Sequence, residues 1–285
     1  MRAVLVRKPG PPADHRVEDV PDPVPGPGQV LIEARAIGVN YPDLLVVEGK
    51  YQLIPPVPYT PGKDGAGLVE AVGEEVSRFK PGDRVYTAGA ITGTYAEYSL
   101  CNESHLGRLP ENVTFEQGAG IWTPYATSYR ALFQKAGVSS GETVLIHGAS
   151  GAVGIAAVQW AKNAGLSVIG TASSDEGKRL AEENGADAVF DHSDIDHLTE
   201  IREHTRGEGV NVIIEMLANV NLERDFEALA KFGRVVVVGE APEKLAARGL
   251  PQMVISRVDL PAPLGPKKPT ISPFSTLNEM SSTAF

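Results

Sequence analysis

One stretch decides the fold: Thr143-Val144-Leu145-Ile146-His147-Gly148-Ala149-Ser150-Gly151-Ala152-Val153-Gly154, a hydrophobic strand that enters a glycine turn and then a helix. Gly148 permits the tight turn, Gly151 lets a diphosphate approach the backbone, and Gly154 lets the helix pack closely on the sheet. The helix start offers unpaired N–H groups to phosphate. Because Ala149 replaces the first glycine of G-x-G-x-x-G, a bare loop is the alternative. The stretch predicts a dinucleotide site with contacts from Ser150, Gly151, Ala152 and Val153.

The residues that follow alternate between strand and helix patterns, as a doubly wound parallel sheet requires. Strands are predicted at Thr143–His147, Ser167–Ala172, Ala188–Phe190, Val210–Glu215 and Arg234–Val238. Helices are predicted at Ala152–Asn163, Asp175–Asn184, Ile195–Thr205 and Leu222–Lys231. Ser173-x-x-Glu176 has the form of a capping box at the start of the second helix. The fold class is therefore α/β, with a Rossmann-type sheet in the second half of the chain.

The composition fits two domains and a small-molecule partner. The chain has 285 residues, of which 42% are hydrophobic, enough for two cores. No apolar run reaches the length of a membrane span, and Met1–Val6 has a strand pattern unlike a signal peptide. The single cysteine, Cys101, fits a reducing compartment, so we expect a cytoplasmic protein. The net charge of −10 argues against a nucleic-acid partner.

The first hundred residues contain short β-type runs broken by proline and glycine, which predicts a β-rich domain. Five segments carry a family resemblance: Gly38-Val39-Asn40 with Asp43, the glycine-rich run 58–85, Tyr95-Ala96-Glu97-Tyr98, His147–Gly151 and Glu215–Leu222. In these segments the chain resembles the medium-chain dehydrogenase/reductases, and among them the zinc-free quinone oxidoreductases of the ζ-crystallin type. The resemblance implies a GroES-like β-rich catalytic domain at residues 1–120 and a Rossmann domain at 121–240.

The residue types argue against a metal. Zinc alcohol dehydrogenases of this superfamily have His-Glu where this chain has Lys63-Asp64, and they use cysteine ligands. The histidines show no ligand spacing with one another or with Cys101, and most are expected to be surface or locally hydrogen-bonded residues. They are His15, His105, His147, His192, His197 and His204. We therefore predict no metal site.

Hydride chemistry without a metal requires a nicotinamide cofactor, and the end of the second strand favours NADPH. NAD enzymes usually place a carboxylate there, whereas this chain has Ser173 and Ser174, with Lys178 or Arg179 one turn later to meet a 2′-phosphate. Against this, Asp175 and Glu176 lie nearby, and Ser173 could simply cap the helix. We predict cofactor contacts from Ser173 and Lys178.

The resemblance implies further cofactor contacts at the ends of the later strands, where open parallel sheets bind their ligands. These contacts are His192, Asn221, Val238 and Gly239. It also implies that Thr127 meets the nicotinamide, the alternative being an ordinary hydroxyl on a helix face.

Three residues are candidates for the substrate side. Asn40 and Asp43 follow a buried strand, and their family counterparts line the cleft near the nicotinamide. Asn40 can donate to a carbonyl oxygen that gains charge, whereas capping of the following turn is the favoured role for Asp43. Tyr51 could stack on a flat substrate, donate its proton or merely pack. Leu45 departs from the tyrosine that relatives often have, which puts the substrate preference in doubt.

The tail at residues 241–285 departs from the family, which continues with strands, a dimer-pairing segment and nicotinamide-side contacts. Its proline-rich start, Leu260–Pro269, and Ser/Thr-rich end predict disorder. We therefore expect an incomplete or truncated sheet, weak NADPH binding or none, and no firm homo-oligomer. Truncation, a gene-model error and a frameshift all remain open as causes.

Together with these residues, the resemblance implies an NADPH-dependent, zinc-free reductase of quinones or related conjugated carbonyls, with a quinone or enone as its small-molecule partner. One alternative is a 2-enoyl-thioester or alkenal reductase, because pocket shape decides between these substrates on one framework. Another is a catalytically inactive structural or RNA-binding ζ-crystallin-like protein, which the acidic net charge disfavours.

Overall fold

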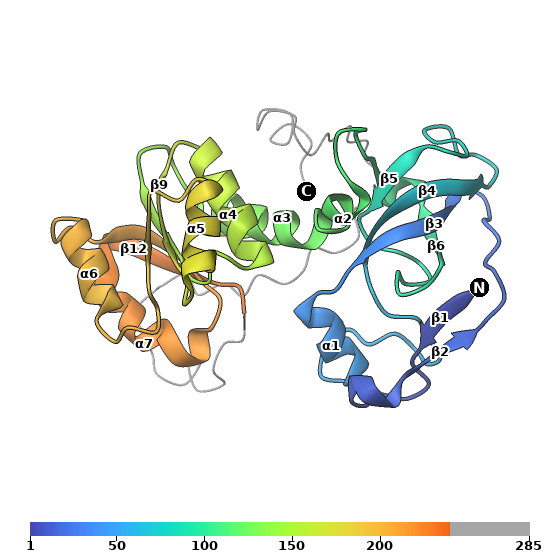
Figure 1. The fold of residues 1–285 in the computed structure, drawn as a ribbon, viewed down its shortest axis with the longest axis horizontal. Helices are drawn as coiled ribbons and strands as arrows, with labels where there is room; N and C mark the ends of the chain where they lie inside the picture. The colour runs from blue at the N-terminus through green and yellow to red at the C-terminus, as the bar shows by residue number, and fades with distance from the viewer. Residues whose placement is uncertain (240–285) are drawn as a thin grey trace. The chain divides into compact units, whose positions relative to one another are not determined.

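The computed structural model describes residues 1–239. Within them the chain forms two compact units, with the boundary between Thr123 and Pro124 (Figure 1). We call residues 1–123 unit 1 and residues 124–239 unit 2. The tail predicted at 241–285 lies outside the described residues. No helix of the described chain is long and apolar enough to cross a bilayer.

Unit 1 is built around an antiparallel sheet with strand order β6-β3-β4-β5-β7. Its strands are β3 (Gln29–Gly38), β4 (Asp64–Val72), β5 (Arg84–Thr87), β6 (Tyr98–Asn102) and β7 (Leu106–Arg108). A separate antiparallel pair joins β1 (Arg2–Leu5) to β2 (Arg16–Asp19), and the helical segments are η1 (Pro12–Asp14), α1 (Tyr41–Val47), η2 (Glu103–His105) and α2 (Phe115–Ala119). Alternate residues of β3 point inward, so Val30 and Ile32 share a core with Val69 and Val85. The predicted β-rich first domain is confirmed.

Unit 2 contains a parallel sheet with strand order β10-β9-β8-β11-β12, the order of a doubly wound fold. Its strands are β8 (Thr143–Ile146), β9 (Ser167–Thr171), β10 (Ala188–Phe190), β11 (Val210–Glu215) and β12 (Leu229–Val237). Its helices are α4 (Ala152–Asn163), α5 (Asp175–Glu183), α6 (His197–His204) and α7 (Ala218–Ala228). They are preceded by α3 (Trp122–Tyr129), which spans the boundary between the units, and by the π-helical η3 (Arg130–Ala136).

Both faces of this sheet are covered because successive strand residues point to opposite sides. Val144 and Ile146 of β8 pack with η3, α4 and α5, whereas Leu145 packs with α6 and α7 (Figure 1). Burial of apolar side chains on both faces is the main stabilising term for such a sheet. The predicted α/β class with a Rossmann-type sheet is confirmed.

The last helix and strand differ from the prediction. Helix α7 begins at Ala218, earlier than the predicted Leu222, and ends at Ala228, before the predicted Lys231. The helix starts early because Ala218 is part of its buried face together with Leu222. It ends early because Leu229 already pairs with Val210 of β11, so β12 starts there and its register shifts before Arg234.

Arg234 fixes the second half of β12 to neighbouring elements. Its Nη1 and Nη2 donate to Glu142 Oε1 and Oε2 at 2.6 and 2.9 Å, and its Nε donates to the Ala136 carbonyl at 2.7 Å. The two parallel bonds to one carboxylate are the geometry in which arginine pairs best. Because Glu142 immediately precedes β8, the pair links the edge strand β12 to the start of the central strand.

Candidate functional site

The glycine turn after β8 has the geometry predicted from its sequence. Gly148 has a φ of +60°, and Gly151 is the N-cap residue of α4. A Cβ on Gly154 would lie 2.1 Å from the Gly148 carbonyl oxygen, so only glycine lets the helix come this close to the turn. Gly151 and Ala152 are exposed, so the first N–H groups of α4 face solvent. The roles predicted for Gly148 and Gly154 are confirmed, and phosphate binding at Ser150–Val153 stays a prediction.

Thr171 ties this turn to the neighbouring strand. Its hydroxyl oxygen accepts from Gly148 N–H at 3.2 Å, and its carbonyl accepts from Ala149 N–H at 2.9 Å. Thr171 is fully buried at the end of β9. The turn is therefore fixed by the sheet as well as by its own glycines.

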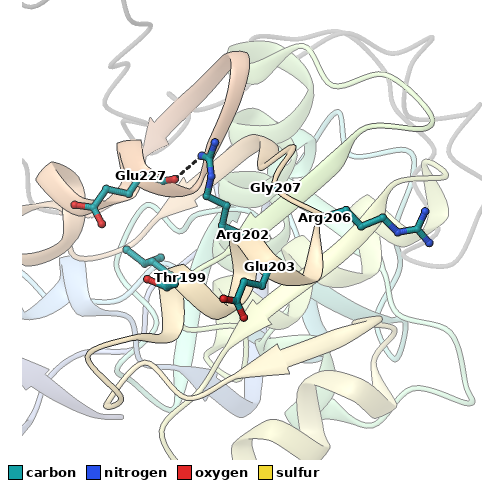
Figure 2. A pocket seen from close by; sticks show the side chains of 7 residues that line it. Thr199, Arg202, Glu203, Arg206, Gly207 and Glu227 are labelled. Carbon is teal, nitrogen blue, oxygen red and sulfur yellow. Dashed lines mark hydrogen bonds between the residues drawn. The ribbon is translucent and has the colours of Figure 1, made fainter.

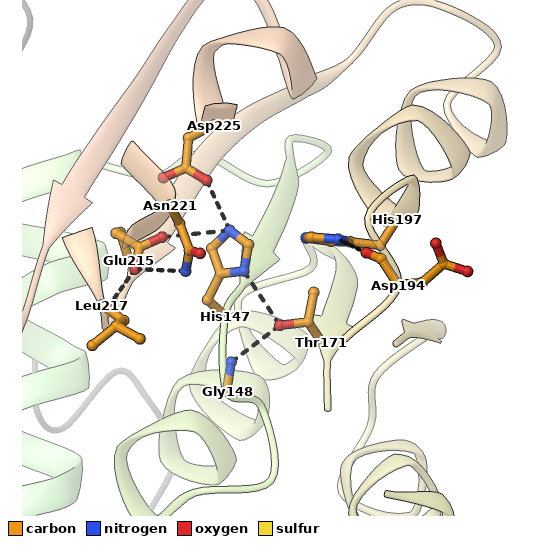
Figure 3. Close-up of polar contacts among 9 residues, drawn as sticks. All are labelled: His147, Gly148, Thr171, Asp194, His197, Glu215, Leu217, Asn221 and Asp225. Atoms are coloured by element: carbon orange, nitrogen blue, oxygen red, sulfur yellow. Dashed lines mark hydrogen bonds and ion pairs between the residues drawn. The ribbon is translucent and has the colours of Figure 1, made fainter. Parts of the chain in front are cut away.

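A buried cluster of one histidine and two carboxylates lies at the same edge of the sheet (Figure 3). His147 Nε2 is 3.0 Å from Asp225 Oδ1 and 3.5 Å from Glu215 Oε2, while Nδ1 is 3.3 Å from Thr171 Oγ1. We call His147, Glu215 and Asp225 the His147 cluster. Glu215 and Asp225 are fully buried, and His147 is 3% exposed. His147 is therefore an exception to the expectation that most of the histidines are surface or locally hydrogen-bonded residues.

Burial sets the titration of this cluster. It raises the pKa of Glu215 to about 7, and the neighbouring Asp225 charge raises it further while His147 opposes the change. It likewise raises the pKa of Asp225 to about 6. For His147 burial favours the neutral ring and lowers the pKa, against the attraction of Glu215.

Glu215 also organises the segment that follows β11. Its Oε1 accepts from the Leu217 N–H and, at 3.3 Å, from Asn221 Nδ2 on α7 (Figure 3). A Cβ on Gly239 would lie 2.0 Å from the Met216 carbonyl oxygen, so the chain after β12 passes directly against this segment. The structure thus brings Asn221, Val238 and Gly239 to the carboxyl ends of β11 and β12.

The remaining predicted contacts in the second half also follow strand ends. Ser173 is exposed after β9, and His192 is exposed after β10. The capping role considered for Ser173 is wrong, because Ser174 is the N-cap and its Oγ accepts from Gly177 N–H at 3.1 Å. Either of two adjacent serines can cap a helix, and here the backbone conformation places the second serine, Ser174, at the N-cap position.

Lys178 already has a carboxylate partner. Its Nζ lies 2.8 Å from Asp191 Oδ2 and 3.9 Å from Asp175 Oδ1. Hydrogen bonds from Lys178 and Ser193 hold the pKa of Asp191 well below its usual range. A 2′-phosphate would therefore have to compete with Asp191 for this ammonium group.

Thr127 carries a buried hydroxyl without a protein partner. The residue is 5% exposed, and none of the residues 1–239 offers its Oγ1 a hydrogen bond. By contrast, the hydroxyl of the adjacent Ser128 donates to the Pro124 carbonyl at 2.8 Å. Buried hydroxyls normally have partners, so this one is suited to a bound ligand.

Unit 1 holds two of the three predicted substrate-side residues, Asn40 and Asp43, in a second polar cluster. Asn40 Nδ2 donates to Asp64 Oδ2 at 3.2 Å, and Asp64 also accepts from Thr123 N–H at 3.0 Å and from Thr123 Oγ1 at 2.7 Å. Asp43 accepts from the Asn40 N–H and from the Tyr95 hydroxyl, both at 3.0 Å. We call Asn40, Asp43, Asp64, Tyr95 and Thr123 the Asp64 cluster.

Both acids of the Asp64 cluster, Asp43 and Asp64, are hydrogen-bonded to neighbouring residues of the chain. The Asn40 N–H bond to Asp43 caps α1. Burial raises the pKa of Asp64 to about 6 although the Thr123 and Asn40 bonds oppose it, and burial raises that of Asp43. Burial and the Asp43 charge raise the pKa of the Tyr95 phenol. Tyr51 is half-buried in the segment after α1, and Leu45 is half-buried on α1.

Several of these residues were missed by the sequence analysis. Asp64 was considered only as the replacement for a zinc ligand, and Tyr95 only as part of a motif. For the His147 cluster a signal exists, because His147, Thr171 and Glu215 each lie two residues after a buried strand residue of the α6/α7 face, namely Leu145, Ile169 and Ile213. Strand periodicity thus predicts that they share one face, but Asp225 requires the position of α7.

A surface depression of about 540 Å³ lies elsewhere on unit 2, between α6 and α7 (Figure 2). Arg206 and Gly207 in its lining lead into the start of β11, and Arg202 donates to the Glu227 carbonyl at 2.8 Å. The lining contains no predicted site residue. Open parallel sheets bind ligands at the carboxyl ends of their strands, so the candidate site is at that edge.

Comparison with known proteins agrees with this organisation. Residues 26–111 match the alcohol dehydrogenase GroES-like domain family, and residues 152–262 match the zinc-binding dehydrogenase family. Human quinone oxidoreductase is 47% identical over 240 residues, which cover 84% of this chain and 73% of that protein.

Solved structures give the same result. A quinone oxidoreductase from Pseudomonas syringae has a TM-score of 0.76 and 35% identity, covering 85% of this chain and 74% of its own. The Escherichia coli quinone oxidoreductase complexed with NADPH has a TM-score of 0.76 and 29% identity, covering 84% and 73%. The chain is therefore an oxidoreductase that belongs to the zinc-free quinone oxidoreductases of the ζ-crystallin type, within the medium-chain dehydrogenase/reductase superfamily.

Proposed function

We propose that this protein is an NADPH-dependent reductase of quinones or related conjugated carbonyl compounds. The observation that carries the proposal is the glycine turn after β8, which presents the start of α4 at the carboxyl edge of a parallel sheet. Unpaired N–H groups and the positive end of the helix dipole favour a diphosphate there. The family relationship supplies the reaction class, and it supports a nicotinamide as the cofactor.

The choice of NADPH over NADH rests on the end of β9. Ser173 and Ser174 offer hydroxyls where NAD enzymes usually have a carboxylate, and Lys178 lies one turn further on. The NADPH complex of the related Escherichia coli enzyme supports the same choice. In this proposal the 2′-phosphate replaces Asp191 as a partner of Lys178. The gain in binding free energy is therefore only the difference between the two ion pairs.

Bound NADPH would supply the hydride, and the residues of this chain bind and orient the reactants. The Thr127 hydroxyl would donate to the nicotinamide carboxamide, which would satisfy an otherwise unpartnered buried group. Asn40 would donate its second amide N–H to the acceptor's carbonyl oxygen as charge develops on it. Asp64 holds the Asn40 side chain through the first N–H and is therefore a positioning residue. Tyr51 stays our candidate for stacking on a flat acceptor or protonating it.

The direct test is NADPH oxidation by the purified full chain with 1,2-naphthoquinone, followed at the nicotinamide absorbance. We expect turnover with NADPH to exceed that with NADH. Crotonyl thioester is the comparison substrate, and a preference for it would replace the quinone by an enoyl thioester. Absence of NADPH binding and of turnover with both substrates would overturn the proposal.

A further inference from the structure

The His147 cluster connects the loops that carry the proposed cofactor contacts. His147 directly precedes the glycine turn, Thr171 bonds both His147 and that turn, and Glu215 bonds Leu217 and Asn221 after β11 (Figure 3). These residues come from three adjacent strands. A change in the cluster therefore acts on two nucleotide-binding loops at once.

These hydrogen bonds accommodate an arrangement of protons in which His147 is neutral. Thr171 Oγ1 already accepts from Gly148 N–H, so its own proton is available to His147 Nδ1. The neutral ring then carries its proton on Nε2, which donates to Asp225 Oδ1 at 3.0 Å. This arrangement leaves His147 uncharged, in agreement with its lowered pKa.

The two carboxyl groups lack enough donors to be charged together. Among residues 1–239, no hydrogen-bond partner reaches Glu215 Oε2 or Asp225 Oδ2. One ligand-type atom from each member of the cluster lies within 4.8 Å of the others. Two buried anions beside a neutral ring are costly, whereas a proton on one of them supplies the missing donor and removes one charge.

We propose that Glu215 and Asp225 share one proton, and that this protonated cluster holds the loops after β8 and β11 in the conformation that binds NADPH. This inference rests on the proposed function. Loss of the proton leaves two negative charges beneath the turn that receives the diphosphate, and their repulsion strains the bonds from Glu215 to Leu217 and Asn221. We therefore infer that NADPH affinity falls as the pH rises.

The surrounding charges support a transition near neutral pH. The pKa values of Glu215 and Asp225 are raised to about 7 and about 6. His147 faces the pair from the end of β8, and Arg224 on α7 lowers the pKa of Asp225. On α6, His197 lies with its ring centroid 6.4 Å from that of His147, and His192 after β10 also interacts with both histidines.

The test is the dissociation constant of NADPH between pH 5.5 and 8.5 for the wild type, Glu215→Gln and Asp225→Asn. We expect the wild type to lose affinity about fivefold, the lower end of typical couplings between two sites. Glu215→Gln keeps a neutral group of the same shape and should remove this loss. Glu227 is an exposed acid on α7, the helix that carries Asp225, and Glu227→Gln should keep the wild-type profile. The 2′-phosphate titrates near pH 6, about where the cluster does, so the difference between variants is the measured quantity.

Each outcome decides between the two proposals. No NADPH binding by the wild type at pH 5.5 overturns the proposed function. Binding whose pH profile is the same in wild type and Glu215→Gln overturns this inference alone. If Glu215→Gln does not fold, as judged by circular dichroism, Asp225→Asn takes its place with the same expectation. One zinc ion per purified chain, lost in His147→Ala, would mean that a metal and not a proton neutralises the pair.

Discussion

The Asp64 cluster and the His147 cluster are both buried groups of acids, but they differ in how many donors surround them. Asp64 receives three hydrogen bonds from neutral donors, and Asp43 receives two. In the His147 cluster, by contrast, one oxygen of each acid has no hydrogen-bond partner within residues 1–239. Neutral donors stabilise a buried negative charge, so Asp64 can act as a fixed acceptor, whereas in our proposal Glu215 and Asp225 share one proton in place of the missing donors.

The largest effect should come from removing Asp64, the acceptor at the centre of the Asp64 cluster. Asp64→Ala leaves the Thr123 N–H, the Thr123 hydroxyl and Asn40 without their partner. We expect a loss of about 3 kcal/mol in unfolding free energy and about 100-fold in kcat/KM with 1,2-naphthoquinone. Urea unfolding and steady-state kinetics measure both. Glu70→Gln, an exposed acid on the same strand β4, is the control and should change neither. Unchanged kcat/KM in Asp64→Ala would refute the positioning role.

The second prediction concerns the contribution of the His147 cluster to the stability of the protein. The folded pKa values of Glu215 and Asp225 lie above their ordinary values, so the folded state binds more protons than the unfolded state. The contribution of these two acids to the unfolding free energy is then fully present below about pH 4, and it decreases as the pH rises to about 7. One pKa unit corresponds to about 1.4 kcal/mol, so the cluster's contribution should fall by roughly 3 kcal/mol.

This decrease can be measured as the difference in unfolding free energy between wild type and Glu215→Gln, from pH 4 to pH 8 without nucleotide. The variant should have the flatter profile. A wild-type stability that rises relative to the variant over this range would mean that both acids are charged in the folded protein, and the contrast between the clusters would disappear.

Thr127 provides a smaller test of the same contrast, since its hydroxyl also has no hydrogen-bond partner within residues 1–239. Thr127→Val removes the hydroxyl at nearly constant volume. We expect unfolding free energy to stay equal or rise by about 1 kcal/mol, while kcat/KM for NADPH falls about tenfold through loss of one hydrogen bond to the nicotinamide. Ser128→Ala, which removes a satisfied hydroxyl, should lower stability and leave kcat/KM unchanged. Equal kinetics in Thr127→Val and wild type would assign the hydroxyl to packing.

The smallest effect is expected at the exposed edge of the nucleotide site. Lys178→Ala should weaken NADPH binding about fivefold, or roughly 1 kcal/mol, because Asp191 already competes for the ammonium group. NADH binding should stay the same. Arg179→Ala tests the alternative contact named from the sequence; that cation pairs at 3.7 Å with Glu183, and if Lys178 is the contact the variant should bind NADPH as the wild type does. An equal loss for NADPH and NADH would exclude a contact with the 2′-phosphate.

The sequence was sufficient for the fold because the signals of the sheet are local. Apolar strands such as Val144–Ile146 and Val212–Ile214 and glycines such as Gly148 determine the parallel sheet and its turn. The start of α7 was misplaced since the buried positions Ala218 and Leu222 depend on the strand next to them. The capping serine was assigned one residue early because Ser173 and Ser174 have the same chemistry.

The polar clusters were harder to predict because their members are distant in sequence. His147 and Asp225 are separated by 78 positions, and Asp64 and Thr123 by 59. Asn40 and Asp43 could be selected because the family motif contains them, but the residues that hold them could not. Which donor reaches which acid depends on tertiary packing, and the pKa values follow from that packing.

The ion pair between Arg234 and Glu142 has a consequence for strand slippage. Arg234 lies in the second half of β12, and the proposed contacts Val238 and Gly239 follow the end of the strand. A strand advances about 3.3 Å per residue, so a slip of two residues would keep each side chain on its face but carry Val238 about 7 Å along the sheet. The same slip would pull the guanidinium away from Glu142. The ion pair therefore adds to the backbone pairing with β11 in holding the position of the cofactor contacts that follow the strand.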